Sequence, residues 1–384
     1  MKNHHFVTVG VWDRKVPTNP LHLPMALAEL GHKVLMIESS LWDKGLTLQP
    51  WKWNRLEMSM KHKNLCLLTI RPPLPRKLSW LNNWFNKHAS KLAHKAMKQL
   101  GFPDDYFAIL FAPSEERLLK WLPGIPFIYR PIDDYAAMPG NADTKEYTIS
   151  IDEKLARSAE AVFPSNPALF RAKKYLNKHV LLIPNAVNFT HFNAAFSAYP
   201  DVLNDLPQPI IGFAGALDRY KFDFKLLSSI ATLRPDWSFV LIGDVGICDS
   251  TSESEIPRLP NIHYIGFRSY EDLPRYIRAF DVGLIPYVHN AYTEGVFPLK
   301  LYEYMAVGVP VVSTDLPFLE SVGDAVLVAN DPDGFVKCIE QALSEDKSIE
   351  VHNRIELARN NSWAERAKGL VNYLEKVEAE NGKK

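Results

Sequence analysis

Residues 293–314, TEGVFPLKLYEYMAVGVPVVST, decide the fold expected for this chain. A loop with Gly295 and Pro298 leads into a helical segment, and Gly308-Val309-Pro310 ends that helix and turns into a buried strand. A helix that leads directly into a short apolar strand is typical of α/β domains with parallel sheets.

The first turn of this helix also has the chemistry of an anion site. Backbone N–H groups near Phe297 to Leu299 have no partner within the helix, and the helix dipole is positive there, so a diphosphate can bind. Lys300 adds a full positive charge, and Glu303, one turn further on the same face, can accept hydrogen bonds from ribose hydroxyls. The alternative is an ordinary helix in which Lys300 and Glu303 form a solvated surface pair.

The alternation of strand and helix extends outward from this segment through the whole chain. In the second half, the apolar runs at 209–215, 238–244, 261–267 and 282–287 are expected strands. Helical patterns at 224–233, 271–280 and 298–308 follow the first, third and fourth of them, and a loop follows the second. In the first half, the expected strands are 6–11, 33–39, 65–70, 107–112, 127–130, 161–164 and 180–183. We therefore predict two Rossmann-like, doubly wound parallel-sheet domains in tandem, with ligands in a cleft between them at the carboxyl ends of the strands.

The 384 residues fit two domains, each large enough for its own core. Residues 192–209 are rich in Ala, Ser, Pro, Asn and Asp without clear periodicity, which is typical of a linker. We expect a first domain at 1–195, a second domain at 205–358 and a last helix at 361–384.

Composition excludes several classes. The 44 basic residues balance 44 acidic ones, so the chain as a whole has no electrostatic footprint for nucleic acid. Cys66, Cys248 and Cys338 have no metal-ligand spacing and are expected to be structural thiols of a reducing compartment. The N-terminus is interpreted as a first strand and not as a signal peptide, and no run of apolar residues is long enough to cross a bilayer, so we expect a cytoplasmic protein.

Four segments in this order resemble a known family. They are IPNAVNFTHF at 183–192, IIGFAGALDRYKFDFKLL at 210–227, NIHYIGFRSYEDLPRYIRAFDVGLIPY at 261–287, and the P-x-K-x-x-E-Y pattern of Pro298, Lys300, Glu303 and Tyr304. Together they resemble the GT-B glycosyltransferases of the GT4 type (glycosyl transferases group 1), especially those that build bacterial polysaccharides. The resemblance covers nearly the whole chain. It implies that the domain at 1–195 binds the acceptor, that the domain at 205–358 binds the nucleotide sugar, and that the last helix at 361–384 returns to the first domain.

The resemblance implies transfer of a sugar from a nucleotide-diphosphate donor, with UDP expected, to a glycan or lipid-linked acceptor in surface polysaccharide synthesis. In such enzymes the residue at Glu303 binds the donor ribose and the residue at Lys221 neutralises the diphosphate. The resemblance also places the base beside Gly266 and Phe267.

Two positions depart from the family pattern. Ala216 stands where the pattern GRLxxxKG has its arginine, and Gly295 stands where the first glutamate of E-x7-E falls, with Glu294 one residue out of register. Lys300 is expected to replace the missing arginine charge, because a diphosphate leaving group needs cations in the transition state. In the same loop, Gly215 would let a phosphate approach the backbone, whereas Arg219 is equally well a surface charge.

In the first half, IYRPIDDYAAMPG at 128–140 places Asp133 and Asp134 just after a strand. A carboxylate there could deprotonate an acceptor hydroxyl, which favours a general-base, inverting mechanism without deciding it. Paired aspartates at a strand end are also common turn and capping residues, in which case His22 is the next candidate base. Asn19 is either an acceptor contact or a helix cap.

The sequence has no Walker loop and no zinc spacing, and we expect no cofactor and no obligatory divalent cation. An NAD dehydrogenase is disfavoured, because no G-x-G-x-x-G follows the first strand of either half. A nucleotide-sugar epimerase of the same architecture and a catalytically silent sugar-binding scaffold remain as alternatives.

Residues 58–103 contain nine lysines and arginines and no Asp or Glu. Within this stretch, Leu81, Phe85, His88 and Leu92 recur at helical spacing beside Trp80 and Trp84, as in an interfacial amphipathic helix. Peripheral contact of residues 71–98 with the inner face of the membrane would suit a lipid-linked acceptor. The alternative is a helix packed on the first domain with a solvated basic face.

Overall fold

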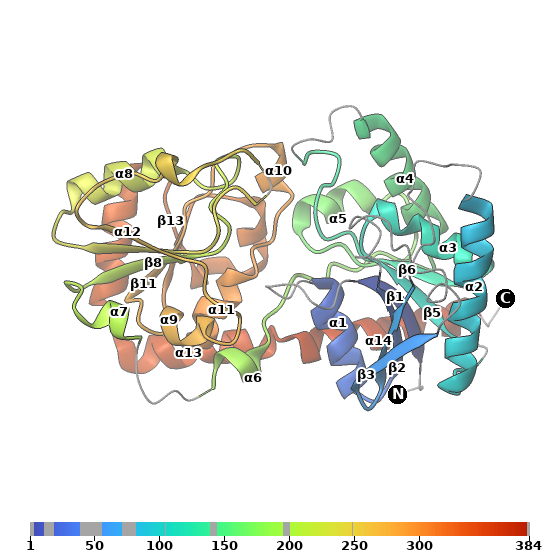
Figure 1. Ribbon diagram of the computed structural model, residues 1–384. Coiled ribbons are helices and arrows are strands. Elements are labelled where there is room, and N and C mark those ends of the chain that lie inside the picture. The colour runs from blue at the N-terminus through green and yellow to red at the C-terminus, as the bar shows by residue number, and fades with distance from the viewer. Residues whose placement is uncertain are drawn as a thin grey trace.

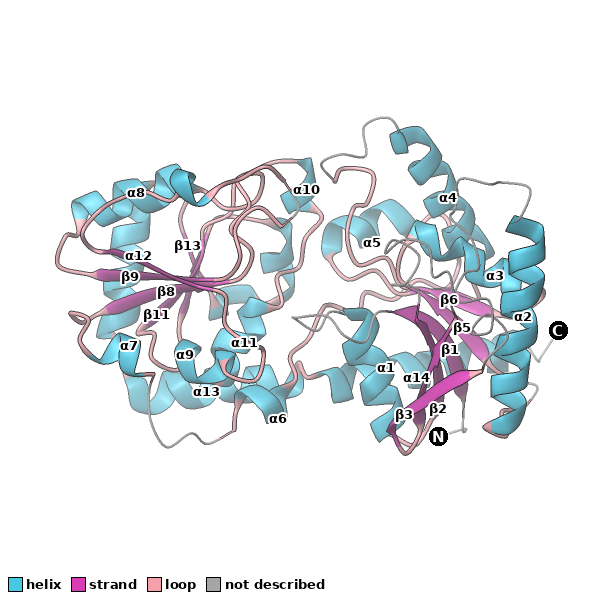
Figure 2. Ribbon diagram, viewed as in Figure 1, coloured by secondary structure: helices cyan, strands magenta, loops and turns pink. Residues whose placement is uncertain are grey.

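The computed structural model describes residues 4–10, 19–38, 56–70, 82–103, 105–138, 144–194, 200–247 and 249–381. Two α/β domains lie side by side, and the last helix, in red, runs from the C-terminal domain back to the N-terminal one (Figure 1). Each domain is a mainly parallel sheet with helices on both faces (Figure 2). This is the predicted GT-B architecture.

The N-terminal sheet has the strand order β3-β4-β2-β1-β5-β6-β7. All of its pairs are parallel except β3 with β4. The strands are β1 (His5–Gly10), β2 (Lys33–Glu38), β3 (Glu57–His62), β4 (Leu65–Thr69), β5 (Phe107–Leu110), β6 (Phe127–Tyr129) and β7 (Ala161–Val162). The central strands are buried along their whole length, because helices cover both faces.

The C-terminal sheet has the order β10-β9-β8-β11-β12-β13 and is parallel throughout. Its strands are β8 (Ile210–Ala214), β9 (Ser238–Ile242), β10 (Ile262–Gly266), β11 (Val282–Ile285), β12 (Val311–Ser313) and β13 (Leu327–Val328). The order reverses at β8 and β11, so the loops after these two strands open at the switch point where α/β sheets bind ligands.

The helices of the first domain are α1 (Asn19–Glu29), α2 (Asn82–Gln99), α3 (Arg117–Trp121), α4 (Lys145–Ser158) and α5 (Pro167–Lys173). The connection contains α6 (Phe189–Phe192) and α7 (Asp201–Asn204). The second domain has α8 (Phe224–Leu233), α9 (Leu273–Ile277), α10 (Ala291–Glu294), α11 (Lys300–Ala306), α12 (Pro332–Ser344) and α13 (Lys347–Asn360), and α14 (Trp363–Asn381) ends the described chain.

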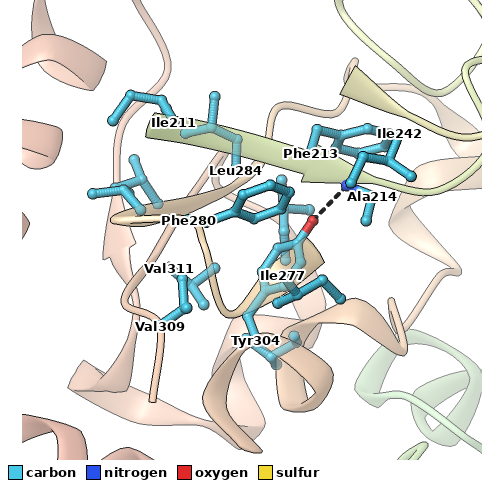
Figure 3. Packing of buried hydrophobic residues seen from close by; sticks show 14 of the residues in the cluster. Ile211, Phe213, Ala214, Ile242, Ile277, Phe280, Leu284, Tyr304, Val309 and Val311 are labelled. Carbon is cyan, nitrogen blue, oxygen red and sulfur yellow. Dashed lines mark hydrogen bonds between the residues drawn. The ribbon is translucent and has the colours of Figure 1, made fainter. Parts of the chain in front are cut away.

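Aromatic side chains fix α11 beneath the second sheet. The Tyr304 hydroxyl accepts a 2.9 Å hydrogen bond from the Ala214 N–H at the end of β8, and Phe280 packs beside it (Figure 3). Gly212 and Gly283 make room for these rings, since an added Cβ would lie 2.2 Å from Phe280 and 2.4 Å from Tyr304 respectively. The start of α11 is thereby held at the carboxyl ends of β8 and β11.

The chain passes between the domains twice at the same place. The Val187 N–H donates to the Asn361 carbonyl, and the Trp363 N–H donates to the Val187 carbonyl. Beyond this point α14 buries Trp363, Leu370 and Leu374 in one hydrophobic cluster with residues of α1 and β1. The last helix is therefore part of the N-terminal domain.

Several elements differ from the sequence expectations. Residues 180–183 form only an isolated bridge from Val180 to Val162, and the helix expected at 271–280 is regular only over Leu273–Ile277. The edge strand β3 was not predicted, because its half-exposed EMSMKH sequence has neither a buried run nor a clear alternation. Val11 and Cys248 lie outside the described residues. No helix in the described part of the chain is long and apolar enough to cross a membrane.

Candidate functional site

Lys300 lies at the centre of the candidate site, at the first position of α11. The side chain is buried, and its Nζ donates a 2.7 Å hydrogen bond to the Tyr287 hydroxyl. The same ammonium lies 4.3 Å from the centre of the Phe213 ring. Burial and the neighbouring Lys221 lower the pKa of Lys300 well below its ordinary value, against the opposing effect of Glu303. Lys300 is therefore not the solvated surface lysine of the alternative interpretation.

Gly215 follows β8 directly and lies under the Lys300 ammonium. Its φ is +149°, and a Cβ added there would come within 2.6 Å of Lys300 Nζ. The space above this glycine was predicted to admit a phosphate. In the structure it admits the lysine head, so Gly215 brings the cation close to the backbone at the end of β8.

Glu303 lies one turn after Lys300, on the same face of α11, as predicted from their spacing. Burial raises the pKa of the Glu303 carboxyl to about 7, and Lys300 acts in the opposite direction. A partly buried carboxylate that can accept hydrogen bonds suits a ligand with neighbouring hydroxyl groups.

Lys221 and Arg219, from the loop after β8, have different environments. Lys221 Nζ lies 5.1 Å from the centre of the Tyr287 ring, so it joins Lys300 at this aromatic side chain. Arg219 instead donates to Ser250 Oγ at 2.7 Å and forms an exposed ion pair with Glu255. The two lysines thus lie together, whereas Arg219 has the surface role that the sequence left open.

Gly266 and Phe267 lie at the end of β10, where the nucleotide base was expected. Gly266 has a φ of +73° with open space above it, and its carbonyl accepts from the Gly243 N–H. The Phe267 carbonyl accepts a 2.8 Å hydrogen bond from Arg268 Nη1. The backbone here already has partners, and Arg268 is a further donor at this edge.

Asp133 faces these residues from the N-terminal domain. Burial raises the pKa of its carboxyl to about 6, Lys221 opposes this rise and Asp134 adds to it. Asp133 also contributes to the raised pKa values of Tyr287 and Tyr292, in both cases after burial. An N-domain carboxylate that interacts with Lys221 and these tyrosines lies opposite the lysine pair.

Asp134, the second member of the predicted pair, is part of a turn. Its Oδ1 accepts hydrogen bonds from the Ala136 and Ala137 N–H groups at 3.1 and 3.2 Å. This is the local capping geometry that the sequence offered as the alternative for both aspartates. The structure separates the two: Asp134 closes a turn, while Asp133 is electrostatically coupled to Lys221 of the other domain.

The position that the family pattern gives to a glutamate is a point of contact between the domains. A Cβ at Gly295 would lie 2.9 Å from the Asp134 Cβ, so no larger residue fits without a shift. The Gly295 carbonyl accepts from Asn166 Nδ2 at 2.7 Å, and the Phe297 carbonyl accepts from Asn185 Nδ2 at 2.7 Å. Asn166 also caps α5 by accepting from the Leu169 N–H.

Three residues of the site could not be predicted from the sequence: Asn166, Asn185 and Tyr287. Asn166 gave the ordinary signal of a helix cap, and Asn185 lies within the IPNAV segment that carried the resemblance. A tyrosine after a buried strand has no sequence signal to indicate that it contacts two lysines, as Tyr287 does with Lys300 and Lys221.

Two other N-domain residues were candidates for the site, His22 as a base and Asn19 as an acceptor contact. His22 is buried in α1 and stacks on Trp363, with 5.6 Å between the ring centres. Burial lowers the pKa of His22 to about 4, and the neighbouring His191 contributes to this shift. A weakly basic, packed imidazole is a poor general base near neutral pH. Asn19 is the first residue of α1, and the loop before it lies outside the described residues.

In α2, Leu92 belongs to the hydrophobic core, together with Ala89, Ala93 and Met97. These described residues of α2 thus pack on their own domain. Residues 71–81 lie outside the described part of the chain.

Comparison with known families gives a match over residues 208–345 to the model described as glycosyl transferases group 1. TuaH of Bacillus subtilis (strain 168), whose name assigns it to teichuronic acid biosynthesis as a glycosyltransferase, is 31% identical over 189 residues, which are 47% of this chain and 47% of TuaH. The O-antigen chain mannosyltransferase B of Escherichia coli is 37% identical over 107 residues, 27% of each chain. The matches thus span about half the length of the first relative and about a quarter of the second.

Solved structures match over almost the entire chain. Sucrose-phosphate synthase from Thermosynechococcus elongatus has a TM-score of 0.68 at 17% identity and covers 98% of this chain and 99% of its own. HepE of Anabaena, solved with UDP and glucose, has a TM-score of 0.66 at 13% identity, with 96% and 99% covered. At such low identity these matches establish the fold.

Proposed function

We propose that this chain, a GT-B protein whose residues 208–345 belong to the glycosyl transferases group 1, transfers a sugar from a nucleoside-diphosphate donor to a hydroxyl of a glycan or lipid-linked acceptor. The observation that carries the proposal is the arrangement across the domain boundary. Lys300 and Lys221 gather at one tyrosine of the C-terminal domain, and a carboxylate with a raised pKa faces them from the other domain.

In the proposed reaction the donor diphosphate binds at Lys221 and Lys300, beside Gly215 and the start of α11 at Pro298 and Leu299. Glu303 accepts hydrogen bonds from the ribose, and the base lies at Gly266 and Phe267. The two cations stabilise the negative charge that develops on the diphosphate as the bond to the anomeric carbon breaks.

Asp133 is the proposed base. It takes the proton of the acceptor hydroxyl while the oxygen forms its bond to the anomeric carbon, and the nucleoside diphosphate leaves with the bonding electron pair. The raised pKa suits this role, because a base with a pKa of about 6 is ionised at neutral pH and still accepts a proton readily. Asp134 holds the turn that carries Asp133.

UDP is the proposed nucleotide, on the analogy of HepE, and bacterial polysaccharide synthesis is the proposed context, on the analogy of TuaH. The test has two steps. A panel of UDP-, GDP- and dTDP-sugars is screened by thermal shift, and release of the nucleoside diphosphate is then measured with and without glycan and lipid-linked acceptors. Release that depends on both donor and acceptor is expected, whereas equal release in the absence of acceptor would contradict transfer.

The reaction is proposed to need no divalent cation, because two lysines lie where the diphosphate charge must be neutralised. Transfer should therefore persist in EDTA. Loss of activity in EDTA that is restored by Mg²⁺ or Mn²⁺ would overturn this part of the proposal.

Contact with an anionic membrane through α2 is proposed as the route to a lipid-linked acceptor. Four exposed lysines lie on one side of this helix, namely Lys87, Lys91, Lys95 and Lys98. Each lysine near an anionic surface contributes about 1 kcal/mol, so four should hold the protein reversibly. The apolar side of α2 is in the core, so the contact is electrostatic and should weaken with salt.

Sedimentation with vesicles tests this contact. Binding to phosphatidylglycerol vesicles and not to phosphatidylcholine vesicles is expected, with at least a tenfold loss when all four lysines are changed to glutamine. The control changes four exposed lysines elsewhere, namely Lys174, Lys225, Lys337 and Lys376. Equal losses in both variants would show that only total charge matters.

A further inference from the structure

Tyr287 lies two residues beyond the end of β11 and is 1% exposed. Its backbone N–H donates to Thr314 Oγ1 at 3.2 Å and to the Ile285 carbonyl at 3.0 Å, so the residue is fixed at the carboxyl ends of β11 and β12. Its ring is buried as well, and both Lys300 and Lys221 contact it.

The two ammonium groups meet this one side chain in different ways. Lys300 Nζ donates to the hydroxyl at 2.7 Å and lies 5.0 Å from the ring centre, whereas Lys221 Nζ lies 5.1 Å from the ring centre. Contacts at this distance let an aromatic ring attract a cation electrostatically. Tyr287 is thus the element that holds two like charges in one place before any anion arrives.

Because Lys300 is buried, its ammonium group needs a hydrogen-bond acceptor, and Tyr287 provides one. Lys300 is desolvated and repelled by Lys221, and both effects favour loss of its proton, while Glu303 favours its retention. A buried ammonium needs hydrogen-bond acceptors to stay charged. Tyr287 itself stays a neutral phenol, because burial, Glu303, Asp133 and Asp218 all raise its pKa.

We propose that Tyr287 is a positioning residue for the donor diphosphate: its hydroxyl accepts a hydrogen bond from Lys300, keeps that lysine protonated and holds it over Gly215, beside Lys221. This inference rests on the proposed function, because it assigns the lysine pair to a nucleoside diphosphate. It explains how two adjacent buried or half-buried lysines can both serve as cations.

Tyr287→Phe is the test variant, because it keeps the ring and removes only the oxygen. Affinity for UDP, and in parallel for GDP, is measured by calorimetry from pH 7 to pH 10 in wild type, Tyr287→Phe, Lys300→Ala and the double variant. A hydrogen bond to a charged group predicts roughly a tenfold to a hundredfold loss of affinity in Tyr287→Phe. The affinity should also begin to fall at a lower pH than in wild type, because Lys300 loses its proton more easily without the acceptor.

The double variant should bind no more weakly than Lys300→Ala, since the hydroxyl acts through the lysine. Tyr129→Phe is the structural control, because it removes another buried tyrosine hydroxyl, bonded to Asp152 at 2.5 Å in the other domain. It should lower the melting temperature without moving the pH dependence.

Each alternative outcome is decisive. Unchanged affinity and an unchanged pH profile in Tyr287→Phe would overturn the role of Tyr287 while leaving the proposed function intact. Additive losses in the double variant would show that the hydroxyl contacts the ligand independently of Lys300, which also overturns the inference. A wild-type protein that binds neither UDP nor GDP overturns the proposed donor, and this inference with it.

Discussion

The side-chain amide of Asn166, in the N-terminal domain, donates a 2.7 Å hydrogen bond to the main-chain carbonyl of Gly295, in the C-terminal domain. Asn166 is fully buried, and its carbonyl oxygen is used to cap α5, so the amide has one orientation. From the same helix, Arg171 forms an exposed ion pair with Glu320 of the other domain. The loop before α11 is therefore held from the opposite domain.

Replacing Gly295 with alanine should weaken the contact between the two domains at Asn166 and Gly295. The new Cβ would lie 2.9 Å from the Asp134 Cβ, so the backbone must shift and the bond from Asn166 must lengthen. Overpacking of this kind costs about 1–3 kcal/mol. We expect a lower melting temperature, a larger radius of gyration by X-ray scattering and slower transfer.

The matched control for this variant is Gly369→Ala in α14, where an added Cβ meets nothing within 4 Å. Because glycine in a helix interior is unfavourable, this change should stabilise the protein by about 0.5–1 kcal/mol. A Gly295→Ala protein with wild-type stability and dimensions would show that the domains do not approach this closely in solution.

Glu303 should make stability depend on pH. Burial raises its pKa from 4.5 to about 7, so between these values the folded protein binds more protons than the unfolded one. The free energy of unfolding should therefore fall as pH rises through this window. Glu303→Gln should remove this loss and be more stable than wild type above pH 7, by on the order of 1–3 kcal/mol.

Urea denaturation at pH 5 and pH 8 measures this difference. Asp205→Asn, which changes an exposed carboxylate at the end of α7, should follow wild type at both pH values. If Glu303→Gln also follows wild type, the carboxyl is better solvated than its burial indicates. The same variant should bind the nucleoside diphosphate more weakly, because a neutral amide oxygen accepts a weaker hydrogen bond from the ribose than a carboxylate does.

Much of the fold could be predicted from the sequence because its signals are local. Buried strands such as β8 and β11 are short apolar runs, and each is followed by a helical pattern. The spacing of Lys300 and Glu303, three residues apart, is enough to predict that they share one face of a helix. These parts of the site could be predicted because one element contains them.

The rest of the site depends on contacts between distant segments. The sequence shows only that Gly295 stands where the family pattern has a glutamate. The structural reason for a glycine there is the close approach of Asp134, which belongs to the other domain. The two aspartates have identical local context, and only the turn at Ala136 and Ala137 distinguishes them. Such relationships have no periodicity in the chain and so leave no pattern to read.

The last helix should be essential for stability although it lies away from the proposed chemistry. Leu370 of α14 is fully buried in the cluster that includes α1. Leu370→Ala should cost about 2–5 kcal/mol. Lys376→Ala, at an exposed position of the same helix, should stay within about 0.5 kcal/mol of wild type. Truncation after Asn360 should destabilise the protein more than either, and a truncated chain with an unchanged melting temperature would contradict the role of α14.

Asp133 should set the acidic limb of the pH profile. Its pKa is raised to about 6 by burial, which outweighs the opposing Lys221, and Asp134 adds to the rise. A base must be ionised to take a proton, so turnover should fall as pH drops through about 6 and level off above it. Asp133→Asn should lower turnover by about a hundredfold to ten-thousandfold and abolish this limb.

The effect of Asp133→Asn on binding has the opposite sign. Its negative charge competes with the diphosphate for Lys221, so removing it should leave nucleoside-diphosphate affinity unchanged or slightly higher. Asp134→Asn is the matched control, because asparagine keeps the oxygen that accepts from Ala136 and Ala137, and turnover should stay near normal. A large loss in Asp134→Asn with none in Asp133→Asn would exchange the two roles. Normal turnover in both variants would mean that the two aspartates only shape the turn. His22 would not replace them, because it is packed against Trp363 and has a pKa of about 4. The base would then have to come from another part of the N-terminal domain.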